Sequence, residues 1–229
     1  MCGRFALTAP APVLRRVFPG LELGVELDPR YNLAPGQDVL VIERDGDRLR
    51  GRMRHWGVDV AMGRGMIRHG LINVRVETAG LRHGFAELVA RSRVLVPASH
   101  FYEWRRLGRR RQPVAVLPRT QLVCFAALLG HWHDPAGDAD LPGVVILTCG
   151  PNADVAALHD RMPAVLGPAA WARWLSPETG VDEALDLLHP APDGTFTTRT
   201  LCSLVNDVRN EGPEVMEEGP EELWLPGIG

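Results

Sequence analysis

Hydrophobic and polar residues alternate along several short stretches of the chain, which is typical of β-strands with one buried face. Residues 39–43 and 49–56 show this pattern on either side of Asp45-Gly46-Asp47, and together they predict a β-hairpin. Further strands are predicted over 71–78, 94–97, 113–117, 122–129, 144–148 and 201–210. Apolar residues at helical spacing predict short helices over 11–19, 84–92, 152–159, 169–175 and 181–188.

Segments rich in glycine or proline are expected to connect these elements. Residues 28–36 contain two prolines and a glycine and predict an ordered loop, and the glycine-rich residues 57–70 predict a surface loop. A third loop is expected around His131, His133 and Asp134. This H-x-H-D sequence resembles part of a metal site, but no partner motif accompanies it, so we expect no metal.

Composition narrows the class of protein. With 229 residues and 45% hydrophobic content, the chain can bury a substantial core as one large domain or two small ones. The four cysteines show neither C-x-x-C nor zinc spacing, and no signal peptide is seen, which favours a reduced cytoplasmic setting. The longest apolar run, near residues 144–147, is too short to span a bilayer, so no membrane is expected. No P-loop or G-x-G-x-x-G is present, and we expect no nucleotide cofactor.

All 25 basic residues are arginine, and the net charge is -3. Seven of the acidic residues follow Asn206, which leaves residues 1–205 with a net charge of +3 and permits a basic face. We expect the acidic tail to be a solvated appendage.

Arginines cluster at two places. One group alternates along a predicted strand, and the other surrounds Gly108, the predicted turn of a hairpin; the members are Arg48, Arg50, Arg52 and Arg54, and Arg105, Arg106, Arg109, Arg110 and Arg111. The first group is either a solvated strand face, which we favour, or a phosphate-binding stripe. The second group is either a plain hairpin turn or a contact with phosphate.

Cys2 gives the amino terminus an unusual chemistry. If Met1 is removed, the chain begins with an α-amine and a thiol on adjacent carbons, whose reference pKa values are about 7.7–8.0 and 8.5. The amine can condense with an aldehyde to a Schiff base, and the thiolate can then close a five-membered thiazolidine ring. A terminal cysteine without any chemistry is the simpler alternative.

Three polar positions elsewhere fit acid–base chemistry. Asn73 lies with Arg75 on one side of the segment 71–78, although any half-buried strand alternates in this way. Glu103 is flanked by Tyr102 and Trp104, which can desolvate its carboxylate and raise its pKa, although a solvent-facing glutamate is commoner. His159 precedes Asp160 and Arg161, so it can act as an acid or base or can be a partly buried histidine without a role.

Four separated segments now point to one family. MCGRFAL at 1–7, RYNLAPG at 30–36, LINVRVET at 71–78 with VPASHFYEW at 96–104, and LHDRMPAVL at 158–166 resemble the SOS-response-associated peptidase (SRAP) family, the abasic-site processing proteins, and SLVNDVRN at 203–210 is a weaker match. These segments occur in family order over nearly the whole chain.

The resemblance implies a single α+β domain, residues 1–210, with a mixed, partly barrel-like β-sheet core flanked by helices, followed by an acidic tail at 211–229. It also implies the site residues. The expected catalytic residues are Cys2, Asn73, Glu103 and His159, and the expected DNA-binding residues are Arg4, Asn32, Pro35, Arg75, Trp104, Thr148 and Arg161.

The resemblance implies a DNA-repair activity of the SOS response. The protein is expected to crosslink covalently to abasic sites in single-stranded DNA through a Cys2 thiazolidine, with lyase-like chemistry and an autopeptidase activity. Glu103 would move protons as the sugar opens, Asn73 would hold the Cys2 amine or the sugar, and His159 would protonate the departing oxygen or assist reversal. We expect a cytoplasmic monomer, associated with the nucleoid if bacterial, with no cofactor.

Two alternatives stay open: a self-processing cysteine peptidase of the N-terminal-nucleophile type with no DNA role, and a noncatalytic DNA-binding module. The sequence also departs from the family pattern. His100 occupies a position where relatives commonly have glycine, residues 57–70 lack the proline and tryptophans of many relatives, and Cys149-Gly150 replaces commoner small residues.

Overall fold

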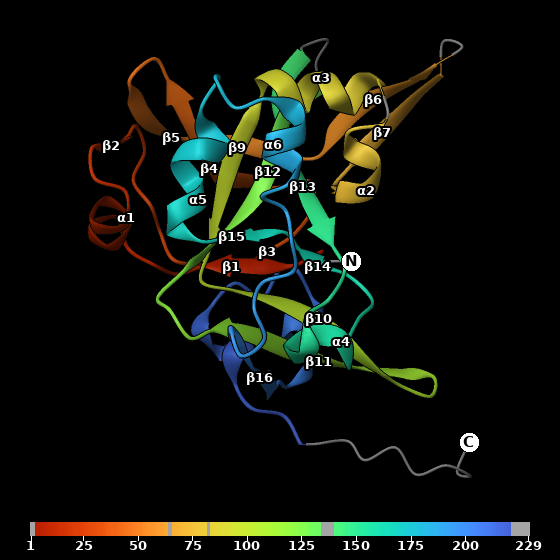
Figure 1. The fold of residues 1–229 in the computed structure, drawn as a ribbon. Coiled ribbons are helices and arrows are strands. Elements are labelled where there is room, and N and C mark those ends of the chain that lie inside the picture. The colour runs from red at the N-terminus through yellow and green to blue at the C-terminus, as the bar shows by residue number, and fades with distance from the viewer. Residues whose placement is uncertain (1–2, 64–65, 82, 134–139, 221–229) are drawn as a thin grey trace.

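A closed ring of five strands forms the centre of the molecule in the computed structural model, which describes residues 3–63, 66–81, 83–133 and 140–220 (Figure 1). In order around the ring, the strands are β13 (Asp140–Cys149), β5 (Arg48–Trp56), β4 (Asp38–Asp45), β9 (Arg93–Ala98) and β12 (Val123–His133). β12 pairs again with β13 and closes the ring, and the β13–β5 pair is parallel while the others are antiparallel. The predicted α+β class with a mixed, barrel-like sheet is confirmed.

A second, antiparallel sheet packs against the barrel and contains the amino-terminal strand in its interior. Its order is β16 (Phe196–Thr200), β11 (Arg110–Pro118), β10 (His100–Leu107), β1 (Phe5–Leu7) and β3 (Arg30–Leu33). Phe5 is fully buried, and its ring lies 5.1 Å from that of Trp56 and 5.6 Å from that of Phe125. Aromatic burial therefore fixes the start of the chain between the barrel and the second sheet.

Helices flank the barrel (Figure 1). They are α1 (Ala11–Val17), α2 (Val76–Ala79), α3 (His83–Arg91), α4 (Ala153–Ala156), α5 (Pro168–Leu175) and α6 (Val181–Leu185). α5 is held to β9 because the buried Trp174 donates its indole N–H to the carbonyl of Val94 at 2.8 Å. Trp171 and Trp174 thus pack as anchors, and the five predicted helices are confirmed apart from their ends.

The remaining elements are short. They are β2 (Leu21–Leu23), β6 (Val58–Gly63), β7 (Met66–Leu71), β8 (Asn73–Arg75), β14 (Met162–Pro163), β15 (Val165–Leu166), and the 3-10 helices η1 (Ser203–Asn206) and η2 (Pro213–Met216).

Several sequence expectations were wrong about these short elements. Residues 57–70 are not a surface loop: they contain strands β6 and β7, and Val58 and Val60 are buried. Residues 28–36 contain strand β3, which pairs with β1. The glycines and prolines that suggested loops are tolerated because they occupy strand ends and turns.

Two predicted extended segments are shorter than expected. The strand expected over 71–78 ends at Arg75, and α2 begins at Val76. Asn73 and Val74 are both buried within β8, so the predicted alternation fails. The strand expected over 201–210 is replaced by η1. His131 and His133 belong to β12 and not to a loop, and Asp134 lies outside the described residues.

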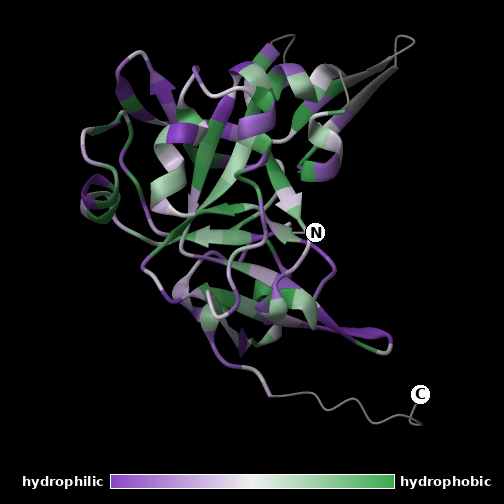
Figure 2. Ribbon diagram, in the orientation of Figure 1, coloured by the Kyte–Doolittle hydropathy of each residue, from purple (hydrophilic) through white to green (hydrophobic). Residues whose placement is uncertain are grey.

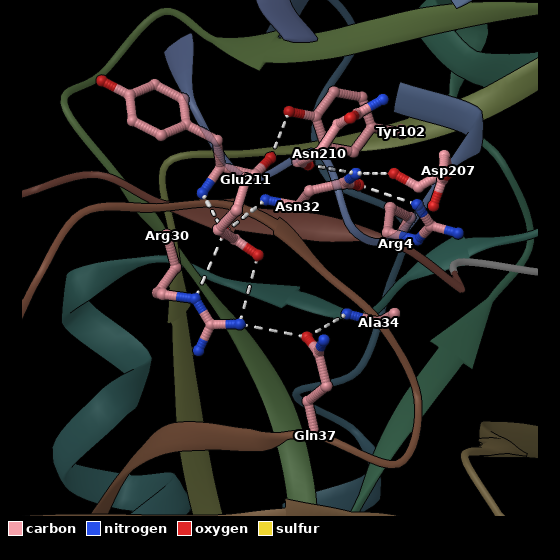
Figure 3. Close-up of polar contacts among 10 residues, drawn as sticks. Arg4, Arg30, Asn32, Ala34, Gln37, Tyr102, Asp207, Asn210 and Glu211 are labelled. Carbon is pink, nitrogen blue, oxygen red and sulfur yellow. Dashed lines mark hydrogen bonds and ion pairs between the residues drawn. The ribbon is translucent and has the colours of Figure 1, made fainter. Parts of the chain in front are cut away.

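The segment that follows residue 210 is packed against β3. Glu211 accepts hydrogen bonds from the backbone N–H groups of Tyr31 at 2.7 Å and Asn32 at 3.0 Å, and pairs with Arg30 at 3.2 Å (Figure 3). Val215 is fully buried. The expectation of a solvated appendage is therefore wrong for residues 211–216, whereas the domain boundary at 210 stays a prediction.

Replacing Glu211 by alanine removes the acceptor of two strand N–H groups. Because a charge-assisted hydrogen bond contributes more than a neutral one, we expect Glu211→Ala to lower the free energy of unfolding by about 2 kcal/mol. Urea denaturation followed by circular dichroism measures this change. Glu217→Ala, an exposed acid in the same segment, is the control, and equal losses in the two variants would contradict the account.

Candidate active site

A cavity of about 430 Å³ opens between the β10–β11 hairpin and the segment that follows α4. Its lining residues are Glu103, Trp104, Arg105, Arg106, Arg111, Ala157, Leu158, His159 and Asp160. Three residues expected at the site from the sequence, Glu103, Trp104 and His159, therefore meet in one cavity although they come from distant parts of the chain.

The Glu103 carboxyl group is the most strongly perturbed acid in this cavity. Its residue is only 3% exposed, because β10 lies between β11 and β1 in the second sheet. Burial, together with the nearby negative charge of Asp160, raises the pKa of Glu103 to about 7. A carboxyl group with this pKa can both give and take a proton near neutral pH.

His159 lies on the opposite wall, with its Nδ1 atom 2.8 Å from the Asp160 carboxylate and 3.0 Å from the backbone N–H of Arg161. A hydrogen bond to Asp160 needs a proton on Nδ1, whereas the hydrogen bond from the Arg161 amide needs an Nδ1 atom without a proton. The tautomer of His159 therefore decides which of the two hydrogen bonds forms. Partial burial lowers the pKa of His159, and the positive charge of Arg106 acts in the same direction. The imidazole is consequently neutral at pH 7 and can accept a proton.

A second cavity, of about 450 Å³, adjoins the first and shares Trp104 and Arg111 with it. Gly3, Arg4 and Asn206 complete its lining. Trp104 is held from two sides: its indole N–H donates to Oδ1 of Asn206 at 2.7 Å, and the Arg4 guanidinium lies 5.7 Å from the ring centroid.

Arg4 is oriented by buried polar groups. Its Nη1 donates to Oδ1 of Asn32 at 2.7 Å (Figure 3). The same atom donates to the carbonyl of Val205 at 2.7 Å, and burial lowers the pKa of Arg4. Asn32 is fully buried, and its amide nitrogen donates to the carbonyls of Asp207 and Asn210. In this arrangement Asn32 positions Arg4 and lines neither cavity.

A third group of the expected residues lies where β8 runs parallel to β13. Arg75 is in register with Thr148, and the buried Asn73 is one of the other β8 residues. Arg161 forms a bidentate pair with Glu77, at 2.5 and 2.8 Å, and also donates to the carbonyl of Thr148. The hydrogen bond from the Arg161 amide to His159 connects this group to the first cavity.

Pro35 is exposed in the turn after β3 and lines neither cavity. His100 lines neither cavity either, because it is buried with Nε2 at 2.8 Å from the hydroxyl of Tyr102. Cys2 lies outside the described residues, but its chain neighbour Gly3 lines the second cavity.

Sequence reasoning missed Asn206 as the partner of the Trp104 indole. It also did not place Arg111 at both cavities. The available signals were the weaker family match at 203–210 and the arginine cluster around Gly108.

Comparison with known proteins identifies the family. The sequence model of the SOS response associated peptidase (SRAP) family matches residues 1–208. The chain belongs to the SRAP family. Among SRAP relatives, the abasic site processing protein YoqW of Bacillus subtilis is 34% identical over 95% of this chain and 99% of its own length. The abasic site processing protein YedK of Escherichia coli is 29% identical over the same shares of the two chains.

The fold agrees with this assignment. A crystal structure of a protein from Bacteroides thetaiotaomicron superposes with a TM-score of 0.81 over 96% of this chain and all of that chain, at 19% identity. This likeness concerns the fold alone. Over the described part of the chain, no helix is long and apolar enough to cross a membrane, and no group of three or more His, Cys, Asp or Glu residues could hold a metal ion.

The raised pKa of Glu103 predicts a pH-dependent stability. The unfolded chain releases the Glu103 proton near pH 4.5 and the folded chain near pH 7, so wild-type stability falls as the pH rises between these values. Relative to Glu103→Gln, which does not titrate, the loss should reach about 3 kcal/mol by pH 8. Urea unfolding of both proteins at several pH values measures it, and a constant difference from pH 4.5 to 8 would contradict the assigned environment.

Proposed function

We propose that this SRAP protein processes abasic sites in single-stranded DNA by forming a covalent thiazolidine between Cys2 and the abasic sugar. One observation carries the proposal: Glu103 and His159 line a cavity adjoining the one lined by Gly3, the residue joined to Cys2. The names of the relatives, abasic site processing proteins, support the choice of substrate.

The chemistry starts from the abasic deoxyribose, whose hemiacetal ring is in equilibrium with an open aldehyde. After removal of Met1, the Cys2 α-amine adds to the aldehyde carbon and water leaves, which gives a Schiff base. The Cys2 thiolate then adds to the same carbon and the imine nitrogen takes up a proton, which closes the thiazolidine. Because no imine persists, β-elimination and breakage of the strand are avoided.

The side chains of the first cavity supply the proton transfers. With a pKa near 7, Glu103 can take the proton of the hemiacetal hydroxyl and return it to the departing ring oxygen. His159, whose pKa is lowered, can accept a proton when water is lost or return one during reversal. Asn73 offers an amide that can hold the Cys2 amine or the sugar by hydrogen bonds.

DNA binding follows from the surroundings of this cavity. Trp104 offers a stacking surface for a base, and Arg4 and Arg75 offer charges for phosphates. Arg161 is paired with Glu77 and donates to the Thr148 carbonyl, so it acts by positioning strand β13. Asn32 and Thr148 are fully buried, so we assign them to positioning the arginines that contact them. Pro35 is exposed and is assigned a contact with DNA outside the two cavities. We further propose that the protein acts as a monomer in the cytoplasm or on the nucleoid and that the same site can remove residues preceding Cys2.

The covalent step depends on the thiol of Cys2. We expect the Met1-processed protein to form a heat-stable adduct with single-stranded DNA carrying one abasic site, resolved on a denaturing gel, and Cys2→Ser to lose it. Cys202→Ser, which alters a partly exposed thiol elsewhere, is the matched control and should retain the adduct. No adduct from processed wild-type protein, with Met1 shown absent by mass spectrometry, would refute the proposal.

The proton transfers depend on Glu103. Glu103→Gln keeps the shape of the side chain but cannot transfer a proton, so we expect crosslinking to slow by about 10²-fold or more while affinity for undamaged DNA is retained. The wild-type rate should change with pH through a group titrating near pH 7, and the variant should lack that step. Single-turnover rates at saturating protein over pH 5–9 measure both effects. A pH profile shared by the two proteins would argue against this role.

A further inference from the structure

Five arginines gather at the tip of the β10–β11 hairpin. We call residues 105–111 the arginine hairpin, and its members are Arg105, Arg106, Arg109, Arg110 and Arg111. The chain turns at Gly108, whose φ of 61° suits glycine. The hairpin extends away from the second sheet (Figure 1) and is strongly hydrophilic (Figure 2).

The charges of this hairpin differ from those of the other arginine cluster, on β5. There the side chains pair with acids of the same surface: Arg48 with Glu22 at 2.8 Å, Arg50 with Asp45 at 2.7 Å, and Arg52 and Arg54 with Glu43 at 2.9 and 3.0 Å. The β5 cluster is therefore largely neutralised by its own protein, as the interpretation of a solvated face requires.

Four of the five arginines of the arginine hairpin differ from the β5 cluster in this respect. Among the described residues, Arg105, Arg106, Arg109 and Arg111 have no ion-pair partner, and Arg106, Arg109 and Arg111 are exposed. Glu103 and Asp160 line the same cavity as Arg105, Arg106 and Arg111, and Asp160 contacts His159. These four guanidinium groups thus form a positive surface that no acid of the described part of the chain neutralises by an ion pair.

The strand register adds a second argument. Arg106 and Arg111 lie directly opposite one another on the two strands, and like charges in such a pair repel. The period of two places Trp104 on the same face as Arg106. An anion bound between the two guanidinium groups would relieve the repulsion, and the neighbouring aromatic ring would offer a base a place to stack.

The hairpin is also continuous with the site. Arg105, Arg106 and Arg111 line the cavity of Glu103 and His159, and Arg111 also lines the cavity of Gly3. From Trp104 to Leu107 an extended strand covers about 10 Å. At about 3.4 Å per nucleotide of a stacked strand, this distance corresponds to about three nucleotides.

We infer that the arginine hairpin binds the phosphates of the single strand on one side of the abasic nucleotide and so sets how firmly the protein holds DNA outside the reacting sugar. This inference rests on the proposed function for the identity of the strand. It assigns a role to side chains that the family resemblance does not include among the DNA-binding residues.

Neutralising the hairpin tests the inference. The variant carries Arg106→Gln, Arg109→Gln and Arg111→Gln, and the matched control removes the same charge from β5 through Arg48→Gln, Arg50→Gln and Arg52→Gln. We expect the hairpin variant to bind an undamaged single-stranded oligonucleotide about tenfold more weakly by fluorescence anisotropy, and the control to stay within about twofold of wild type. The slope of log K against log[salt] should become less steep by about 2, since each of the three lost phosphate contacts contributes about 0.7 to it.

Shortening the oligonucleotide locates the contact. Wild-type affinity should fall when the flank on one side of the abasic position is removed, and the hairpin variant should be insensitive to the same removal. Equal binding by the hairpin variant and the control, with equal salt slopes, would overturn the inference. So would a loss that appears only with RNA of the same sequence.

The outcome is separable from that of the proposed function. If wild-type protein crosslinks abasic DNA and the hairpin variant binds DNA like the control, DNA binding by the arginine hairpin is refuted and the proposed crosslinking stands. Wild-type protein that never crosslinks, together with weakened DNA binding by the hairpin variant, refutes the thiazolidine chemistry and leaves the hairpin as a DNA-binding surface.

Discussion

The burial of Phe5 is the contact on which the site depends. Its ring packs on Trp56 and Phe125, and its backbone pairs with strands on both sides, since Phe5 is opposite Phe101 on β10 and Leu33 on β3. A strand in the interior of a sheet cannot slip by one residue without turning its buried side chains outward. Gly3 and Arg4 are thereby fixed at the cavities, and the residue before them in the chain is Cys2, the proposed nucleophile.

Desolvation then gives the site its chemistry. The same packing that buries β1 leaves Glu103 almost without solvent, which raises its pKa, while Asn32 Oδ1 and the carbonyl of Val205 accept hydrogen bonds from Arg4 and hold its guanidinium in place. The C-terminal segment contributes to this enclosure, because Asn206 holds Trp104 and Glu211 holds β3. Residues from both ends of the chain therefore shape one pair of cavities.

Local pattern was sufficient for much of the fold. The hairpin at 39–56 has clear alternation and a turn sequence, and the helix at 169–175 has two tryptophans at helical spacing. The strands at 58–71 were missed because glycines interrupt the alternation, and the segment 71–78 was misjudged because Val76 begins a helix where period two would continue. β-branched residues such as Val76 can lie in a strand or in a helix, so tertiary packing determines which of the two forms there.

The site could be found only in part from the sequence. Family motifs pointed to Glu103, His159 and Arg4, which the fold brings to two adjoining cavities. The Asn206–Trp104 and Glu211–Asn32 contacts join residues more than 100 positions apart, and no local pattern encodes them. The two arginine clusters look alike in the sequence, and only the fold shows that acids pair with the arginines of β5, whereas Arg106, Arg109 and Arg111 have no ion-pair partner among the described residues.

The central claim is that both the amine and the thiol of Cys2 react with the abasic sugar. The most direct measurement is mass spectrometry of the adduct after treatment with iodoacetamide and digestion of protein and DNA. A thiazolidine leaves no free thiol, so the account predicts a Cys2 peptide that carries the sugar residue with loss of one water and no alkylation. A sugar-bearing peptide with an alkylated Cys2, or a sugar attached to another residue, would contradict it.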